Sequence, residues 1–172
     1  QPLGRVGQIM PVQANLRYAD SVAAAVRDAE IVVNLVGILA ESGAQTFQAV
    51  QAEGAGIVAQ AAAAEGARLI HMSAIGADEN SESVYAQTKA AGEKAAFAAV
   101  PSATVFRPSV VFGPDDQFLN LFAHLQAFLP VMALASADAR LQPVYVVDVA
   151  DEAQGQVIIL RLDPAGAGQA AA

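Results

Sequence analysis

Short β-branched runs alternate along this chain with longer, alanine-rich stretches, and this alternation restricts its fold more than any other feature. The short runs are typical of strands and the long stretches of helices, so the pattern predicts strands joined by helices. Strands connected in this way run parallel, with the helices covering the sheet. The expected fold class is therefore α/β, with a doubly wound parallel sheet. Expected strands cover residues 8–14, 30–36, 68–73, 103–107 and 142–147, and expected helices cover residues 20–29, 46–65, 84–99, 117–129 and a segment beginning at Asp148.

Several residues refine these expected elements. The run 30–36 (EIVVNLV) is almost entirely apolar, so this strand is predicted to be buried on both faces. Gly66 follows the 46–65 helix at the position of a left-handed C-terminal cap. Pro101 bars continuation of the 84–99 helix. Pro11 removes a backbone donor from the 8–14 run, which places that strand near an edge of the sheet.

Composition excludes several classes of function. The chain has 172 residues, 55% hydrophobic and 15% charged, and a net charge of −8, which disfavours nucleic acid as a partner. It has no cysteine, and its two histidines, His71 and His124, are isolated, so no metal site is expected. The longest apolar run, residues 31–40, is about half the length that spans a bilayer, so no transmembrane segment is expected.

Tyr85 and Lys89 are the residues that point to chemistry. They are four residues apart in the expected 84–99 helix and therefore share one face of it. An ammonium beside a phenol favours the phenolate, so Lys89 is expected to lower the pKa of Tyr85 and to bind a ribose hydroxyl. Ser73 ends the preceding strand, at the edge where doubly wound sheets bind ligands, and its hydroxyl is expected to reach the same substrate oxygen. Considered alone, the pair is also compatible with a half-exposed tyrosine beside an unrelated surface lysine.

Six segments together resemble the short-chain dehydrogenase/reductase superfamily in its extended or atypical branch. They are VVNLVGIL (32–39), FQAVQAEGAGIVAQAA (47–62), RLIHMSAIGAD (68–78), YAQTKAAGEKA (85–95), ATVFRPSVVFGPDDQFLNLF (103–122) and QPVYVVDVAD (142–151). Their combination is most similar to the nucleotide-binding accessory subunits of respiratory complex I, NADH:ubiquinone oxidoreductase, and their bacterial relatives. The resemblance implies an incomplete Rossmann-type NAD(P)-binding domain over residues 1–150, followed by a C-terminal helix and tail over residues 151–172.

The resemblance also implies roles for individual residues. Tyr85 corresponds to the acid/base, Lys89 to its pKa modulator and ribose ligand, and Ser73 to the hydroxyl at the strand end. The implied cofactor is NADP or NAD, with no readable preference. The implied cofactor contacts are Leu35, Val36 and Gly37 along the central part, Asn15 and Leu16 beside the adenine, and Pro108 and Ser109 facing the nicotinamide.

Three positions depart from the pattern of the resemblance. Ala74 stands where many relatives carry the working serine or threonine, so Ser73 is also readable as a structural hydroxyl. Val110 replaces an asparagine that often binds substrate in sugar-nucleotide members, and Gln51 replaces a common helix asparagine. Together these departures weaken any expectation of sugar chemistry.

The first strand, glycine-rich turn and second strand of the implied fold are not found before Gln8. The sequence Gly4-Arg5-Val6-Gly7 leads into an expected strand, so it cannot present a helix N-terminus to a pyrophosphate. The two strands would otherwise separate the 8–14 strand from the 30–36 strand, whose edges would be left unpaired. We therefore expect these residues to belong to a longer polypeptide.

Three functional hypotheses follow. The first is an NAD(P)-binding protein whose dinucleotide mainly supports structure or assembly, with complex I subunits as implied partners and a cytoplasmic or peripheral location at the inner face of the respiratory membrane. The second is an active NAD(P)-dependent oxidoreductase or epimerase that uses Tyr85 as acid/base. The third is a cofactor-free regulatory or interaction module on the same scaffold.

Overall fold

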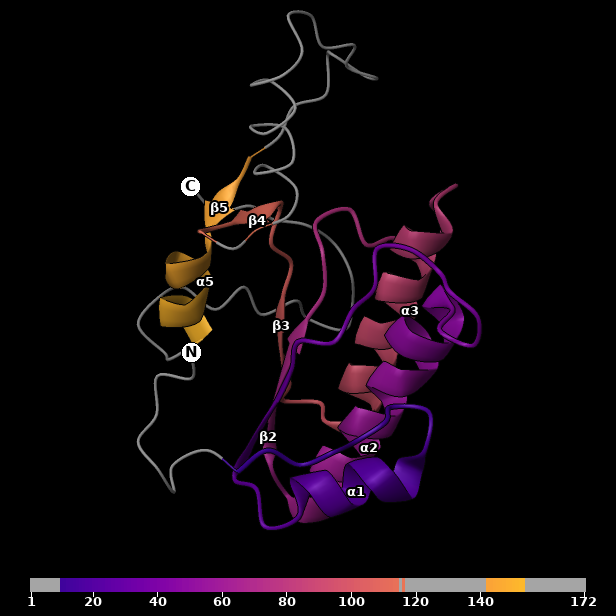
Figure 1. Cartoon of the computed structure of the whole chain (residues 1–172), viewed down its shortest axis with the longest axis vertical. Helices are drawn as coiled ribbons and strands as arrows, with labels where there is room; N and C mark the ends of the chain where they lie inside the picture. The colour runs from indigo at the N-terminus through magenta and orange to yellow at the C-terminus, as the bar shows by residue number, and fades with distance from the viewer. Residues whose placement is uncertain (1–9, 115, 117–141, 154–172) are drawn as a thin grey trace, which may run out of the picture.

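A parallel sheet of three strands forms the centre of the computed structural model, which describes residues 10–114, 116 and 142–153 (Figure 1). The strands are β1 (Ile31–Asn34), β2 (Arg68–Met72) and β3 (Thr104–Phe106), in the order β1-β2-β3. Asn34 lies opposite His71 in the register of the first pair. A helix joins each strand to its parallel neighbour, which confirms the predicted α/β fold class.

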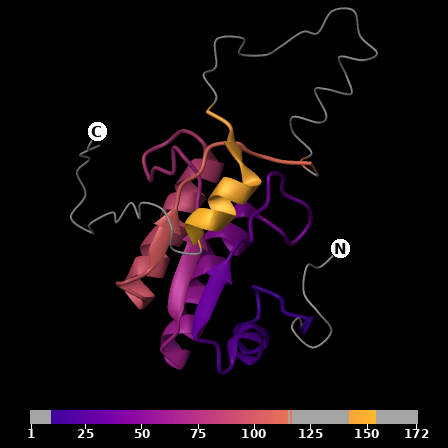
Figure 2. The ribbon, with the colours of Figure 1, turned by 90° about the vertical axis from the view of Figure 1, so that its left-hand side faces the viewer.

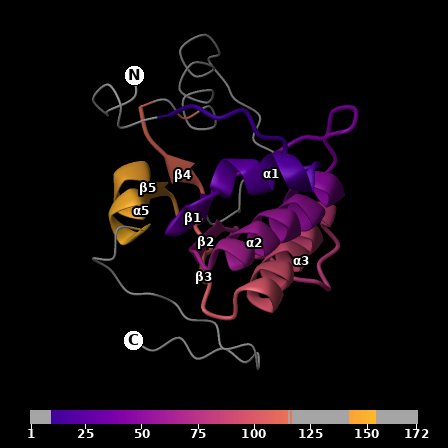
Figure 3. The ribbon, with the colours of Figure 1, turned by 90° about the horizontal axis from the view of Figure 1, so that it is seen from below.

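Helices cover the two faces of this sheet unequally. Figure 3 shows α1 (Ala19–Val26), α2 (Gly54–Glu65) and α3 (Val84–Ala99) on one side and α5 (Val146–Ala153) on the other. The core lies between the sheet and the first three helices. Its fully buried helix residues are small, which lets helices and sheet approach closely. The buried cluster consists of Val22, Val32, Val58, Ala59, Ala62, Ala67, Leu69, Ala96, Val100 and Ala103.

The helix ends follow the local sequence where the signals are strong. α3 has the predicted bounds, and Gly66 adopts φ 68°, with its N–H bonded to the carbonyl groups of Ala62 and Ala63. The predicted 46–65 helix begins differently, because its first part is the π-helical segment η1 (Gln48–Glu53), which continues directly into α2. Helix propensity does not distinguish a π turn from an α turn, so packing decides this feature.

The chain after β3 contains more structure than predicted. β4 (Val111–Phe112) lies between the predicted 103–107 strand and the predicted 117–129 helix and pairs in parallel with β5 (Val144–Tyr145). α5 begins at Val146, two residues before the predicted start at Asp148, which lies in its first turn. The predicted 117–129 helix and the Gly4–Gly7 sequence lie outside the described residues.

Two strand predictions need correction. Residues 10–14 of the predicted 8–14 strand are not in a strand, because no described strand lies beside them to supply hydrogen bonds. β1 is buried on one face only: Ile31 and Val33 are 49% and 48% exposed, while Val32 and Asn34 are buried. α5 lies in front of the exposed face of β1 (Figure 2), and a cavity of about 720 Å³ lies between the two. None of the described helices is both long and apolar enough to cross a membrane.

Candidate functional site

A cleft of about 250 Å³ lies beyond the carboxyl ends of the strands, where doubly wound sheets bind ligands. The loops around it are tied together, because Ser73 N–H donates to the Phe106 carbonyl (2.7 Å) and Ile75 N–H donates to the Pro108 carbonyl (2.9 Å). Most of the predicted site residues line this cleft. They are Leu35, Gly37, Ser73, Tyr85, Lys89, Pro108 and Ser109, joined by Ile38, Leu39, Met72, Ala74 and Val111, which the sequence analysis did not assign.

Three predicted cofactor contacts lie elsewhere. Val36 does not line the cleft, although both its neighbours along the chain do contribute to this region. Asn15 is exposed and closes a turn, because its Oδ1 accepts the Arg17 N–H at 3.1 Å. Leu16 packs on α2, where a Cβ added to Gly54 would lie 3.1 Å from the Leu16 Cβ. Asn15 and Leu16 therefore take no part in this cleft.

Lys89 is the buried cation of the cleft, with only 5% of its surface exposed. Its Nζ donates to the Met72 carbonyl at 3.2 Å. Burial lowers the pKa of Lys89 because it removes water from the ammonium, and the negative charge of Glu93 partly opposes that shift. An ammonium has three donors, so Lys89 keeps hydrogen-bonding capacity for a ligand hydroxyl in the cleft.

Tyr85 forms the neighbouring wall. Its ring meets the edge of Phe47 at a centroid distance of 5.8 Å and an interplanar angle of 87°. The predicted lowering of the Tyr85 pKa is wrong for this geometry, because burial raises it. The Lys89 Nζ lies over the ring, 6.0 Å from its centroid. The phenol therefore stays protonated at neutral pH and is a weaker acid than an exposed tyrosine.

Ser73 is buried, and its hydroxyl oxygen has no hydrogen-bond partner among the described residues. Alternation along β2 places Ser73 on the same side of the chain as Leu69 and His71, which face the helices. Ser73 lines the cleft, but its hydroxyl is buried on the side of the strand that faces the helices. Ala74, without a hydroxyl, lines the cleft beside it.

His71 and Arg107 are both held by polar side chains inside the fold. His71 is 2% exposed, and its Nδ1 lies 3.2 Å from the Asn34 Nδ2. Burial, and secondly the Lys89 charge, lower the pKa of His71 to about 4, against a smaller opposing effect of Glu93. Arg107 donates from Nε and Nη2 to the two carboxylate oxygens of Glu93, at 2.8 and 2.5 Å.

Glu93 is a buried charge close to Lys89 that the sequence analysis missed. It is buried and lies four residues after Lys89, so both side chains occupy one face of α3. Its bidentate bond raises the pKa of Arg107. The spacing Tyr85, Lys89, Glu93 was the available signal, because three polar residues at helical spacing mark a polar stripe on that helix.

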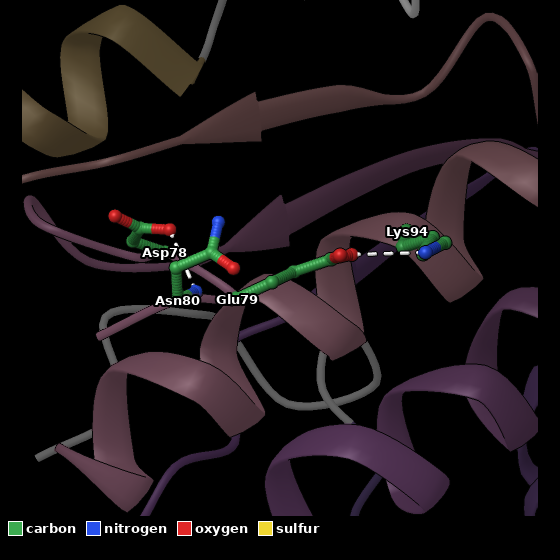
Figure 4. Close-up of polar contacts among 4 residues, drawn as sticks. All are labelled: Asp78, Glu79, Asn80 and Lys94. Carbon is green, nitrogen blue, oxygen red and sulfur yellow. Dashed lines mark hydrogen bonds and ion pairs between the residues drawn. The ribbon is translucent and has the colours of Figure 1, made fainter. Parts of the chain in front are cut away.

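Lys94 is the second lysine of α3 and has a different environment. Figure 4 shows it paired with Glu79 at 3.0 Å, with 75% and 55% of the two side chains exposed. In the same loop, Asp78 Oδ1 accepts the Asn80 N–H at 2.8 Å. Exposed pairs contribute little to stability, so Lys94 serves as a natural control for the buried Lys89.

The parallel sheet and its carboxyl-end cleft define a Rossmann-type fold of the kind found in NAD(P)-dependent reductases and epimerases. Solved structures support this class. A dTDP-4-dehydrorhamnose reductase from Bacillus anthracis, in complex with NADP, matches 81% of this chain and 57% of its own with a TM-score of 0.70 and 19% identity. The Bordetella bronchiseptica enzyme WbmG, in complex with NAD, matches 88% and 55% with a TM-score of 0.65 and 18% identity.

The chain belongs to the RmlD substrate binding domain family, which matches residues 5–160. Among curated proteins it is similar to NADH dehydrogenase [ubiquinone] 1 alpha subcomplex subunit 9, mitochondrial, from Dictyostelium discoideum (30% identity over 148 residues) and Arabidopsis thaliana (35% over 154 residues). Each match covers 86% of this chain. A ceramide reductase of Caulobacter vibrioides is 35% identical over 125 residues, 72% of this chain.

These comparisons confirm the resemblance to the short-chain dehydrogenase/reductase superfamily and to complex I accessory subunits. The chain spans about 40% of the length of these curated relatives: 41%, 38% and 39% respectively.

Proposed function

We propose that this chain carries the catalytic-side half of a nicotinamide dinucleotide site, and that the bound dinucleotide mainly supports structure or assembly. The observation that carries the proposal is the position of the buried Lys89 ammonium beside Gly37 and Tyr85 in the cleft beyond the strands. The relatives in complex I and the neighbours that hold NADP or NAD support both parts of it.

The cleft fits one end of such a ligand. Its volume of about 250 Å³ is below the range of about 300–1,000 Å³ usual for complete small-molecule pockets. Lys89 would donate to ribose hydroxyls, while Pro108 and Ser109 would face the nicotinamide. The nicotinamide ring supplies hydride chemistry when bound. The preference between NAD and NADP is left to experiment.

The substituted cleft residues favour the structural role over catalysis. The Ser73 hydroxyl is closed off from solvent, and Ala74 presents only a methyl group. The Tyr85 phenol, the Lys89 ammonium and the Ser109 hydroxyl are the polar side-chain groups left in the cleft, and none of them replaces the hydroxyl missing at Ala74. Subunits of respiratory complex I are the proposed partners, and the inner face of the respiratory membrane, or the cytoplasm, is the proposed location.

The open edge of β1 supports a further part of the proposal, that residues 1–150 form an incomplete dinucleotide-binding domain. Ile31, Val33 and Leu35 are about half exposed or more, and β1 has no described strand on its outer side. Further strands of the same polypeptide would pair with this edge and supply the glycine-rich turn.

Thermal unfolding of the complete polypeptide with NADH and with NADPH tests dinucleotide binding. A ligand at a hundred times its Kd stabilises the folded state by about 2.7 kcal/mol. Lys89→Met should abolish the shift in Tm, whereas Lys94→Met, on the same helix, should retain it. If neither dinucleotide raises the Tm of the unaltered protein, dinucleotide binding is rejected.

The second candidate function is an active oxidoreductase or epimerase. It is favoured by the position of the Tyr85 phenol at the cleft wall beside Lys89 and by the reductase among the relatives. Tyr85 would donate its proton to the substrate oxygen during hydride transfer. Turnover that disappears in Tyr85→Phe, with dinucleotide binding retained and Tyr18→Phe unaffected, would establish this function; equal turnover in Tyr85→Phe would exclude Tyr85 as the acid.

A further inference from the structure

Residues 35–38 follow β1 and bring the backbone of Gly37 against the Lys89 ammonium. A Cβ added to Gly37 would lie 3.2 Å from Lys89 Nζ, so a side chain at this position would press against the ammonium. The relative position of the two groups is therefore set by whatever holds this short segment. Two buried side-chain amides hold it, one at each end.

Asn34 holds the first end. It is 4% exposed, and its Oδ1 accepts the Val36 N–H at 3.1 Å. This bond fixes the orientation of the amide, so Nδ2 must face His71, whose Nδ1 accepts from it at 3.2 Å. Asn34 and His71 lie opposite each other in the register of β1 and β2, so these bonds tie the first end of the segment to the sheet.

Gln51 holds the second end. It is 2% exposed, and its Nε2 donates to the Ile38 carbonyl at 2.7 Å. Its Oε1 lies 3.0 Å from the Thr88 hydroxyl, which also approaches the Val84 and Tyr85 carbonyls. Thr88 directly precedes Lys89, so Gln51 ties the second end of the segment to the turn of α3 that carries the ammonium.

The backbone around Gln51 is built to place this side chain. Gln51 lies inside the π-helical segment η1, and its carbonyl oxygen presses on Gly92 of α3, where a Cβ would collide with it. π turns are rare and are frequent at functional sites, because they redirect a side chain without ending the helix. The close approach of η1 and α3 thus brings the Gln51 amide within reach of both Ile38 and Thr88.

We propose that Asn34 and Gln51 are positioning residues that clamp residues 35–38 from both ends, so that the Gly37 backbone and the Lys89 ammonium form one preorganised surface for the sugar of the dinucleotide. The inference rests on the proposed dinucleotide site. The physical gain is entropic, because a segment ordered in advance loses less conformational freedom when the ligand binds. His71 and Thr88 act through the two amides.

Gln51→Met tests the clamp, because methionine fills a similar volume without the amide. Thr88→Val is the matched control, since it removes a hydroxyl at the same crossing but leaves the bond from Gln51 to Ile38. Two quantities are measured in the complete polypeptide: the Kd for NADH and NADPH by calorimetry, and the titration of Lys89 by NMR of labelled lysine in the ligand-free protein. The groups around Lys89, namely Glu93, His71 and Tyr85, are unchanged in both variants.

The clamp predicts that Gln51→Met weakens dinucleotide binding by about tenfold and raises the Lys89 pKa, because the released segment admits water. Thr88→Val should change the Kd by less than about threefold. Unchanged Kd and unchanged Lys89 titration in Gln51→Met would overturn the clamp. If the unaltered protein binds neither dinucleotide, the proposed function fails, while the ligand-free Lys89 titration still decides the clamp.

A second measurement covers the case in which Gln51→Met does not fold. The clamp requires the backbone amides of Val36 and Gly37 in the unaltered protein to be as rigid on the ps–ns timescale as those of α3, by heteronuclear NOE. Mobility of these amides equal to that of the exposed 41–44 loop would overturn it.

Discussion

Lowering the pH from 7.5 to 5 is expected to destabilise this protein through one buried side chain, His71. The Asn34 amide is fixed by its bond to the Val36 N–H, so it presents a donor to His71 Nδ1. Protonated His71 would place a second donor against that group, next to the Lys89 charge. Burial and this charge together lower the pKa of His71 from 6.5 to about 4.

The sign and size of the effect follow from proton linkage. Because the pKa is lower in the folded state, the unfolded chain binds more protons between pH 6.5 and pH 4, so stability falls as the pH falls through this window. One pKa unit corresponds to about 1.4 kcal/mol, which gives a full loss of about 3.4 kcal/mol below pH 4 and about 2 kcal/mol at pH 5.

Urea unfolding at pH 7.5 and pH 5 measures this loss. His71→Gln is the comparison, because glutamine offers an amide oxygen near Asn34 and does not titrate. The carboxylates and His124 are common to both proteins, so their contributions cancel in the difference. The unaltered protein should lose about 2 kcal/mol more than the variant. An identical pH dependence of the two unfolding free energies would refute this account of His71.

Two further substitutions probe packing and charge. Gly92→Ala should destabilise the fold by about 1–3 kcal/mol in urea unfolding, because its Cβ would collide with a backbone carbonyl of η1. Gly56→Ala is the control and should stabilise the fold by about 0.5–1 kcal/mol, because its Cβ would lie 3.5 Å from a methyl group; equal effects of the two substitutions would contradict the close crossing of η1 and α3. Glu93→Gln should lower the free energy of unfolding by about 3 kcal/mol and lower the Lys89 pKa further, because it removes a buried negative charge between two cations. The exposed Glu79→Gln should lower the free energy of unfolding by less than about 1 kcal/mol in the same assay. Similar losses in the two variants would show that the buried pair stabilises the fold no more than the exposed one.

Local signals were sufficient for the elements whose ends are set by single residues. Pro101 follows the end of α3, and Gly66 terminates α2 in the left-handed conformation. These features depend on steric limits within a few residues, which are readable from sequence. The same local reasoning failed for residues 10–14, because a strand exists only where another strand accepts its hydrogen bonds.

Some features of the candidate site were also readable from the sequence, while others depended on the tertiary structure. The assembly of Leu35, Gly37, Tyr85, Lys89 and the Pro108 loop at one edge was predictable, because parallel strands place their carboxyl ends together. The direction of the Tyr85 pKa was not, since it depends on how far the tertiary structure buries the phenol.

The amino-acid sequence by itself determined the α/β class, the parallel order of the elements and the placing of a tyrosine and a lysine on one helix face, because periodicity and turn chemistry are local properties. The tertiary structure alone decided that η1 is a π helix, that Gln51 bonds to Ile38, and that Glu93 and Arg107 pair. Those features arise where segments distant along the chain approach within hydrogen-bond distance, and their energies depend on the burial that this approach creates.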